Sequence, residues 1–225
     1  MSKVLLITGA SSGIGRTTAK SAVEDGYKVI VTARRKRLLD ELVSELGEDN
    51  VLAVASDVSD YEQLKKVVDK GIERFGQLDA VFANAGTGVS ASGTEEGDPQ
   101  EWETMIGVNI TGVLNTAKLT LPHLRKTTGH FLVTGSAAGR TTIKGSIYGA
   151  TKWFVHGFMQ NLAEEMKEWS GRCTTIAPGM VNTPFFDEEK PDKLDPQDVA
   201  DAVLHALNAH PRNCVREIFL MPGYK

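Results

Sequence analysis

The sequence contains only two cysteines, Cys173 and Cys214, among its 225 residues. Two isolated thiols are too few for a disulfide framework, and they lack the spacing of a zinc site. We therefore interpret them as structural thiols in a reducing cytosol. The histidines show neither metal-ligand spacing nor a partnered nucleophile, so no metal is expected. Structural or exposed roles are expected for all five of them: His123, His130, His156, His205 and His210.

Long hydrophobic runs are also missing. The apolar run near the start holds four residues, between Lys3 and Thr8. This is far shorter than a signal-peptide core or the roughly 18 apolar residues of a membrane span. No later stretch approaches that length. We therefore expect a cytoplasmic protein without a membrane partner.

The chain has no strong excess of one charge. Its formal net charge is −4, and the charges are evenly spread. This disfavours nucleic acid or an anionic membrane as the main partner. The exception is a short basic run, Arg34 to Arg37. Hydrophobic residues make up 41% of the chain, which suffices for a large core without disulfides or a metal.

Short apolar runs alternate with helical patterns from end to end. The predicted strands are Val4–Thr8, Lys28–Thr32, Val51–Ala55, Leu78–Phe82, His130–Thr134, Arg172–Ile176 and Glu217–Met221. The predicted helices are Ile14–Asp25, Lys36–Leu46, Tyr61–Phe75, Glu101–Leu124, Ile147–Trp169 and Gln197–Asn208. Strands without polar alternation, each followed by a helix, indicate a parallel sheet covered on both faces. We predict one α/β domain, residues 1–225, with a doubly wound, seven-stranded parallel sheet.

Two segments are predicted to be irregular. Thr87 to Pro99 is rich in glycine and serine, and Pro184 to Pro196 is acidic with three prolines. Both follow strand ends on the side where doubly wound sheets bind ligands. We interpret them as pocket walls, with 184–196 as a short substrate loop.

A glycine-rich turn, TGASSGIG, joins the first predicted strand to the first helix. Gly9 permits a sharp turn, Gly13 lets the backbone approach a pyrophosphate, and Gly15 lets the helix sit close to the sheet. The helix N-terminus offers free N–H groups to an anion. A glycine-rich turn without a ligand is the alternative, and the strand–turn–helix context disfavours it.

Several further motifs follow in a fixed order. They are Asn84-Ala85-Gly86, Asn109, Ser136, Tyr148-x-x-x-Lys152 and Pro178-Gly179. Together with TGASSGIG they resemble the compact form of the short-chain dehydrogenase/reductase family over nearly the whole chain. Ser136 lies twelve residues before Tyr148, one fewer than is usual in that family. The resemblance implies a Rossmann fold and hydride transfer with a nicotinamide dinucleotide.

The resemblance also places residues around the dinucleotide. It assigns Asp57 and Val58 to the adenine and Thr183 to the nicotinamide carboxamide, although Asp57 could equally be a turn residue. The full set that it implies is Gly9, Ser11, Ser12, Gly13, Ile14, Gly15, Arg34, Arg35, Asp57, Val58, Asn84, Ala85, Gly86, Tyr148, Lys152, Pro178, Gly179, Val181 and Thr183.

The end of the second strand predicts which dinucleotide is preferred. An acidic residue there would hold the ribose hydroxyl of NAD, but the sequence reads Val-Thr-Ala-Arg-Arg up to Arg35. The Arg34 guanidinium could pair with the 2′-phosphate of NADP, with Arg16 or Ser12 assisting. The alternative is a solvated helix start. We predict a preference for NADP, with NAD possible.

The reaction centre is predicted from four residues. Tyr148 and Lys152 share a helix face, and a nearby ammonium is expected to lower the phenol pKa of about 10. Ser136 would polarise a carbonyl oxygen. By resemblance Lys152 also bonds the nicotinamide ribose, and Asn109 anchors a water linking Lys152 to solvent. Surface packing, a turn serine and a helix bend are the alternatives to these roles.

The substrate is predicted to be a small carbonyl or hydroxy compound. Its expected contacts are Ser136, Ala138, Ile143, Tyr148, Met180 and Phe185. Phe185 and Phe186 could form an apolar wall or anchor their loop to the core. Arg140 or Lys144 could meet a substrate carboxylate, although exposed loop cations are common. Similarity to NADP-dependent 3-hydroxy-acid (serine-type) dehydrogenases is a narrower possibility.

Two further expectations concern the whole molecule. A non-catalytic dinucleotide-binding regulator is the alternative function, but such proteins often lose the tyrosine or lysine that this chain keeps. The long helices around Glu101–Leu124 and Ile147–Trp169 resemble those that pair across a two-fold axis in the family. A homotetramer is therefore expected, with a dimer as the alternative.

Overall fold

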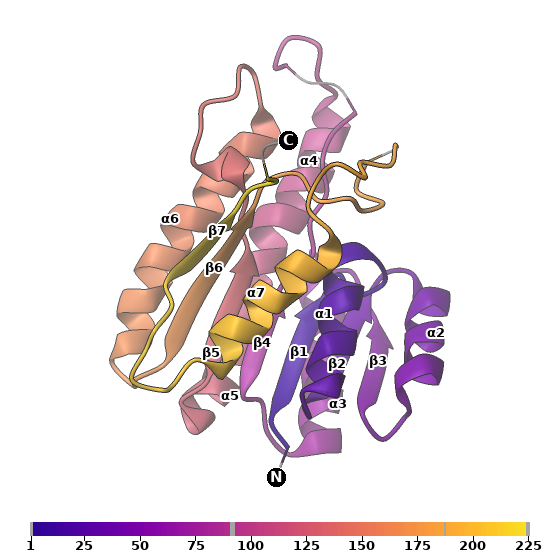
Figure 1. Ribbon diagram of the computed structural model, residues 1–225, viewed down its shortest axis with the longest axis vertical. Coiled ribbons are helices and arrows are strands. Elements are labelled where there is room, and N and C mark those ends of the chain that lie inside the picture. The colour runs from indigo at the N-terminus through magenta and orange to yellow at the C-terminus, as the bar shows by residue number, and fades with distance from the viewer. Residues whose placement is uncertain (1, 91–92, 187, 224–225) are drawn as a thin grey trace.

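A computed structural model describes residues 2–90, 93–186 and 188–223 of the chain. Its strands form one parallel sheet in the order β3-β2-β1-β4-β5-β6-β7 (Figure 1). The strands are β1 (Val4–Thr8), β2 (Lys28–Ala33), β3 (Val51–Ala55), β4 (Ala80–Ala83), β5 (His130–Thr134), β6 (Arg172–Pro178) and β7 (Glu217–Leu220). The seven-stranded sheet and the single domain built around it agree with the prediction from the sequence.

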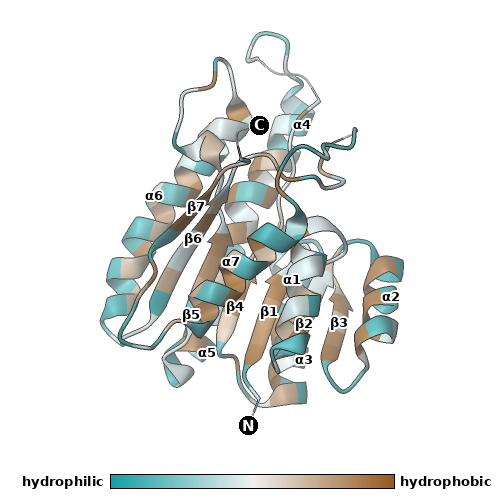
Figure 2. Cartoon of the chain, viewed as in Figure 1, coloured by the Kyte–Doolittle hydropathy of each residue, from teal (hydrophilic) through white to brown (hydrophobic). Residues whose placement is uncertain are grey.

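Helices cover both faces of this sheet. They are α1 (Gly13–Glu24), α2 (Lys36–Leu46), α3 (Tyr61–Phe75), α4 (Pro99–Ile106), α5 (Gly112–Thr127), α6 (Ile147–Lys167) and α7 (Pro196–Asn208). One core layer packs α1, α2 and α7 against the sheet, and the other packs α3, α5 and α6. The strands are the most hydrophobic part of the chain, whereas the helices carry mixed faces (Figure 2). Among the described residues, no helix is long and apolar enough to cross a membrane.

The central strand β1 shows why both layers are needed. Its five residues are all buried, and successive side chains enter opposite cores. Leu5 and Ile7 belong to the layer under α1 and α7, whereas Val4 and Leu6 belong to the layer under α3 and α5. Because β1 lies between β2 and β4, the strand order reverses there, and such a point opens a crevice at the carboxyl ends of the strands.

The prediction of one continuous helix over Glu101–Leu124 is wrong. The structure has α4, then a π-helical turn at Gly107–Thr111, then α5. The π turn places Asn109 where its side chain bonds both backbone groups of Thr87, and this pulls the helix out of its regular spacing. The other predicted ends of helices and strands differ from the structure by at most two residues.

Candidate active site

A cavity of about 890 Å³ opens at the carboxyl ends of the central strands. Its size is typical of small-molecule sites. Both segments predicted to be irregular contribute to its walls, through Gly88 and Phe185 among others. All but two of the predicted site residues line this cavity. The exceptions are Gly15 and Asn109, which pack behind its walls.

The glycine turn is held tightly against its neighbours. Gly9 and Gly13 have positive φ angles of 67° and 51°, which other residues rarely adopt. A Cβ on Gly9 would lie 2.8 Å from the Ala85 Cα atom, and one on Gly15 would lie 2.6 Å from the Gly9 carbonyl oxygen. The turn therefore accepts no side chain at Gly9 or Gly15 without moving the backbone.

Two threonines that the sequence analysis did not single out fix the position of Asn84. The Thr8 Oγ1 atom accepts hydrogen bonds of 3.0 Å from the backbone amides of Asn84 and Ala85. Thr134 Oγ1 donates to Asn84 Oδ1 at 2.9 Å, and Asn84 Nδ2 donates to the Thr8 carbonyl at 3.1 Å. These bonds join the ends of β1, β4 and β5. Only the strand order brings these ends together, so the one signal in the sequence was the threonine that ends β1 and the threonine that ends β5.

The basic run near β2 divides into different roles. Arg35 donates to Ser11 Oγ at 2.8 Å and to Ser12 Oγ at 2.6 Å, so it braces the glycine turn. Arg34 lines the cavity, is exposed, and has no partner for its guanidinium among the described residues. The suggestion that Arg16 helps to bind the 2′-phosphate of NADP is wrong. Its guanidinium donates to the Leu38 carbonyl and to Glu45, and these bonds connect α1 to α2 outside the cavity.

The predicted tyrosine and lysine come together at the start of α6. The Ser146 side chain caps this helix by accepting from Gly149 N at 2.9 Å, which sets Tyr148 in the first turn. Lys152 is only 4% exposed. Its Nζ atom lies 5.7 Å from the centre of the Tyr148 ring and donates to the Thr134 carbonyl at 2.8 Å.

Burial is the main influence on the pKa values of Tyr148 and Lys152. It raises the pKa of Tyr148, and a hydrogen bond with Ser136 opposes that rise. Burial also lowers the pKa of Lys152 to about 8. The expected lowering of the tyrosine pKa by the ammonium is therefore wrong for this state of the protein. The physical reason is that Lys152 donates to Thr134 and both groups are poorly solvated.

The other two predicted catalytic residues occupy turns. Ser136 precedes a short 3₁₀ turn, and its Oγ atom accepts from Ala138 N at 3.1 Å while facing Tyr148. Asn109 is buried, accepts from Thr87 N at 2.9 Å, and donates to Thr151 Oγ1 at 3.1 Å. Its side chain thereby joins the loop after β4 to α6. Its role as a water anchor stays a prediction.

A further set of side chains supports the serine turn from behind. His156 Nε2 lies 3.2 Å from the Ser136 carbonyl, and its Nδ1 lies 3.6 Å from Glu217 Oε1. Glu217, on β7, also pairs with Arg140 at the end of the turn. Arg140 therefore faces β7 rather than the cavity, which disfavours its suggested contact with a substrate carboxylate. The sequence could not show this, because β7 lies 77 residues away from Arg140 along the chain.

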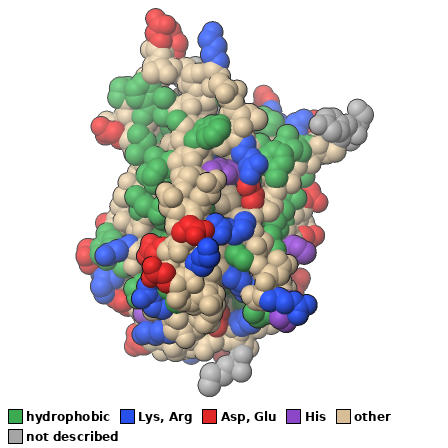
Figure 3. Space-filling model, turned by 90° about the vertical axis from the view of Figure 1, so that its left-hand side faces the viewer, with side chains coloured by type: hydrophobic (Ala, Val, Ile, Leu, Met, Phe, Trp, Pro, Cys, Tyr) green, Lys and Arg blue, Asp and Glu red, His purple; other side chains and the backbone are tan. Residues whose placement is uncertain are grey.

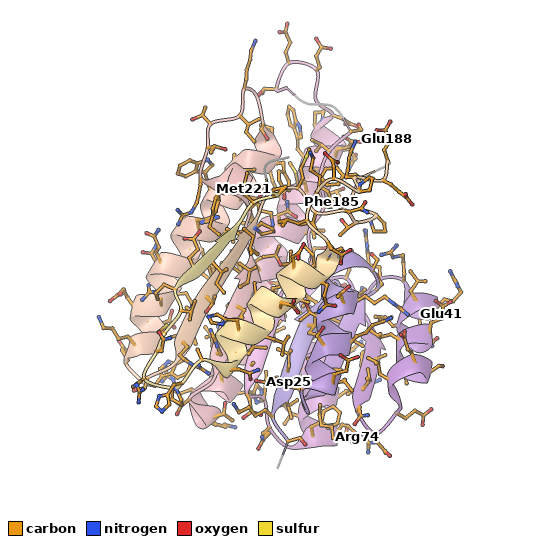
Figure 4. All side chains as sticks on the ribbon, in the orientation of Figure 1. Asp25, Glu41, Arg74, Phe185, Glu188 and Met221 are labelled. Carbon is orange, nitrogen blue, oxygen red and sulfur yellow. The ribbon has the colours of Figure 1, made fainter. Side chains whose placement is uncertain are left out.

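The far end of the cavity is formed by the predicted substrate loop. The Phe185 ring lies 5.7 Å from the Tyr148 ring and 5.3 Å from Phe186. Both phenylalanines line the cavity, so they form the predicted apolar wall. Figure 4 labels Phe185 and Met221, and both lie in the upper part of the molecule, toward the loops beyond the strand ends. A short bridge between Val181 and Leu194 closes the base of the loop.

Comparison with known proteins gives the same family as the motifs in the sequence. The model of the short chain dehydrogenase family matches residues 3–194. An uncharacterised oxidoreductase from Staphylococcus saprophyticus is 38% identical, over 98% of this chain and 97% of the relative. Among solved structures, an alcohol dehydrogenase from the archaeon Thermococcus sibiricus, complexed with 5-hydroxy-NADP, is 33% identical with a TM-score of 0.92, over 100% of this chain and 98% of the other.

Two other structures with different bound cofactors are similar. A serine dehydrogenase complexed with NADP+ is 28% identical, with a TM-score of 0.90 over 98% of this chain and 96% of the other. A 3-ketoacyl-(acyl-carrier-protein) reductase from Brucella melitensis complexed with NADH is also 28% identical, with a TM-score of 0.88 over 96% of both chains. The motifs, the sheet and these similarities agree, and the chain belongs to the short-chain dehydrogenase family of oxidoreductases.

Proposed function

We propose that this protein transfers a hydride between NADP(H) and the carbonyl or alcohol carbon of a small substrate. The observation that carries the proposal is that Tyr148, Lys152 and Ser136 line the same cavity as the glycine turn. The nicotinamide ring would supply or accept the hydride. The protein would supply the proton, the orientation and the exclusion of water.

Each side chain has a defined task in this reaction. Ser136 donates a hydrogen bond to the substrate oxygen, and Tyr148 donates the proton that the oxygen needs when a carbonyl is reduced. Lys152 lies next to the tyrosine and can exchange protons near neutrality, because burial lowers its pKa to about 8. Asn109 fixes Thr87 and thereby the loop beside the reacting groups.

The fit of a dinucleotide follows from the glycine turn. The positive φ angles and close packing of Gly9 and Gly13 leave a cradle without side chains at the start of α1. Backbone amides at a helix N-terminus bind pyrophosphate. The residues that would hold the group are therefore Gly9, Ser11, Ser12, Gly13 and Ile14 around the phosphates, with Asp57 and Val58 at the adenine.

The preference for NADP over NAD depends on Arg34. Among the described residues its guanidinium has no partner, and it lies on the cavity wall directly after β2, where the sequence offers Arg34 and Arg35 instead of a carboxylate for a ribose hydroxyl. The similar enzymes with bound NADP compounds support this choice, and the one with NADH is the alternative.

Replacing Arg34 tests the cofactor preference. Arg34→Ala should raise the KM for NADPH about tenfold while leaving the KM for NADH unchanged, since one charge-assisted bond is lost. Arg37→Ala is the matched control, because Arg37 is exposed and pairs with Glu41 outside the cavity. Better turnover of the wild type with NADH than with NADPH, at equal low concentration, would contradict the preference.

Replacing the tyrosine hydroxyl tests the reaction itself. Tyr148→Phe should lower kcat by about 10²-fold or more, because the proton donor is removed. NADPH binding, followed by nucleotide fluorescence, should change little. Turnover that survives in this variant contradicts the assigned acid. NADPH binding without turnover of any aldehyde or ketone by the wild type favours the alternative, a non-catalytic dinucleotide-binding regulator.

We also propose that the protein is a cytoplasmic homotetramer, with a dimer as the alternative. Exposed hydrophobic side chains on α5 and α6, Leu114 and Trp153, are 39% and 52% exposed and could pair with a second copy. Sedimentation of the purified chain would distinguish the two assemblies from a monomer.

A further inference from the structure

We infer that the substrate is an uncharged, apolar carbonyl compound rather than a hydroxy or oxo acid. This inference rests on the proposed function and concerns the part of the cavity beyond Tyr148. The evidence for it is where the charged and the apolar side chains of the described residues lie around the cavity.

The charged side chains that line the cavity lie either at the dinucleotide end or behind Tyr148. Among the described residues they are Arg34, Arg35, Asp57 and Lys152. The first three follow β2 and β3, at the end where the dinucleotide phosphate and adenine would lie. Lys152 is buried and donates to the Thr134 carbonyl. None of these groups is available to a substrate carboxylate.

The wall around Tyr148 carries large apolar side chains instead, with Thr141 and Ser146 as neutral polar neighbours. Four large hydrophobic side chains line it although water reaches about half of their surface: Ile143, Met180, Phe185 and Met221 are 50%, 47%, 45% and 52% exposed. They come from three separate segments of the chain. Figure 3 shows hydrophobic side chains in several groups among polar ones over the upper part of the face that carries α6. An apolar patch brought together in this way indicates a binding surface.

The cations nearest in sequence to this wall are held elsewhere. Arg140 pairs with Glu217, and on the substrate loop Lys190 pairs with Glu188. Lys144 is exposed and does not line the cavity. A carboxylate that entered here would lose part of its hydration without meeting a cation, and such burial is unfavourable. A neutral substrate would lose much less hydration and would cover the apolar wall.

A matched pair of aldehydes tests the inference. We would compare NADPH-dependent reduction of benzaldehyde and 4-formylbenzoate, which differ by one carboxylate. The neutral aldehyde should show a kcat/KM about tenfold higher or more. Ile143→Arg should reduce or reverse this difference by placing a cation on the wall. Tyr61→Arg, at an exposed hydrophobic residue of α3 outside the cavity, is the matched control and should leave it unchanged.

A binding measurement separates this inference from the proposed function. Benzyl alcohol and 4-(hydroxymethyl)benzoate would be titrated into the protein saturated with NADPH, with calorimetry as the readout. The neutral alcohol should bind more tightly. Equal or tighter binding of the carboxylate overturns the inference whether or not any aldehyde is reduced. A clear preference for the neutral alcohol, together with no reduction of any aldehyde or ketone, supports the inference and overturns the proposed function.

Discussion

Replacing Lys152 by methionine should make the cofactor-free protein more stable while abolishing turnover. The side chain lies almost completely buried and makes a hydrogen bond with the Thr134 carbonyl. Methionine has a similar length and no charge, so it can fill the same space. The wild-type protein holds a lysine there whose charge is poorly solvated, as its lowered pKa shows.

The size of the effect follows from the pKa difference. The pKa of Lys152 falls from 10.5 in the unfolded chain to about 8 in the fold. At 1.36 kcal/mol per pKa unit, keeping the charge at pH 7 costs about 3 kcal/mol of stability. Methionine also loses one hydrogen bond, worth about 1 kcal/mol. The variant should therefore gain about 2 kcal/mol, or about 4–8 °C in Tm.

The sign of the pH dependence gives a second observable. Between pH 8 and 10.5 the unfolded chain keeps the Lys152 proton that the folded chain releases, so this group makes the wild type more stable as pH rises. The advantage of the variant should then shrink by about 1.4 kcal/mol between pH 7 and 9. Groups away from Lys152, such as Tyr27 and Cys173, titrate alike in both proteins and cancel in the difference.

Urea denaturation of the two cofactor-free proteins at pH 7, 8 and 9 measures both quantities. Lys118→Met, on the exposed surface of α5, is the matched control and should change stability by less than about 0.5 kcal/mol. A Lys152→Met variant that is less stable than the wild type at pH 7 would refute the reasoning. So would a stability difference that does not change between pH 7 and 9.

Two further predictions concern the glycine turn and the thiols. Gly15→Ala should lose about 1–3 kcal/mol of stability and weaken NADPH binding, because the new Cβ would lie 2.6 Å from Asn84 and from the Gly9 carbonyl oxygen. Gly157→Ala is the control and should be neutral or stabilising, because nothing lies within 4 Å of its new Cβ. Equal NADPH affinity in both variants would contradict the predicted role of Gly15. In a thiol titration of the native protein, only the exposed Cys214 should react rapidly, because burial raises the pKa of Cys173 to about 12. Rapid reaction of both thiols in the native state would be inconsistent with the burial of Cys173.

The sequence was sufficient where local chemistry decides the structure. Apolar runs without polar alternation predicted each strand, and the helix Tyr61–Phe75 was predicted to the residue. In the structure the Asp60 side chain caps the start of this helix. The glycine spacing predicted a tight turn after β1, and Gly9 and Gly13 have the positive φ angles of such a turn. The four-residue spacing of Tyr148 and Lys152 predicted that they share one helix face, and in the structure they do.

The sequence was insufficient where a contact depends on partners far away in the chain. The π turn at Asn109 exists because Thr87 comes within reach, and Arg16 and Arg140 leave the cavity because Glu45 and Glu217 attract them. The pKa of Tyr148 moves opposite to expectation, since burial is a property of the assembled core and has no local signature.

The amino-acid sequence by itself therefore determined the family, the parallel sheet and the residues that face one another within single helices and turns. Only the tertiary structure decided which cations remain available at the cavity, how the Ser136 turn is braced and how apolar the wall beyond Tyr148 is. The physical reason is that periodicity and turn chemistry act over a few residues. Desolvation and ion pairing instead depend on distances that exist only once the strands are in order.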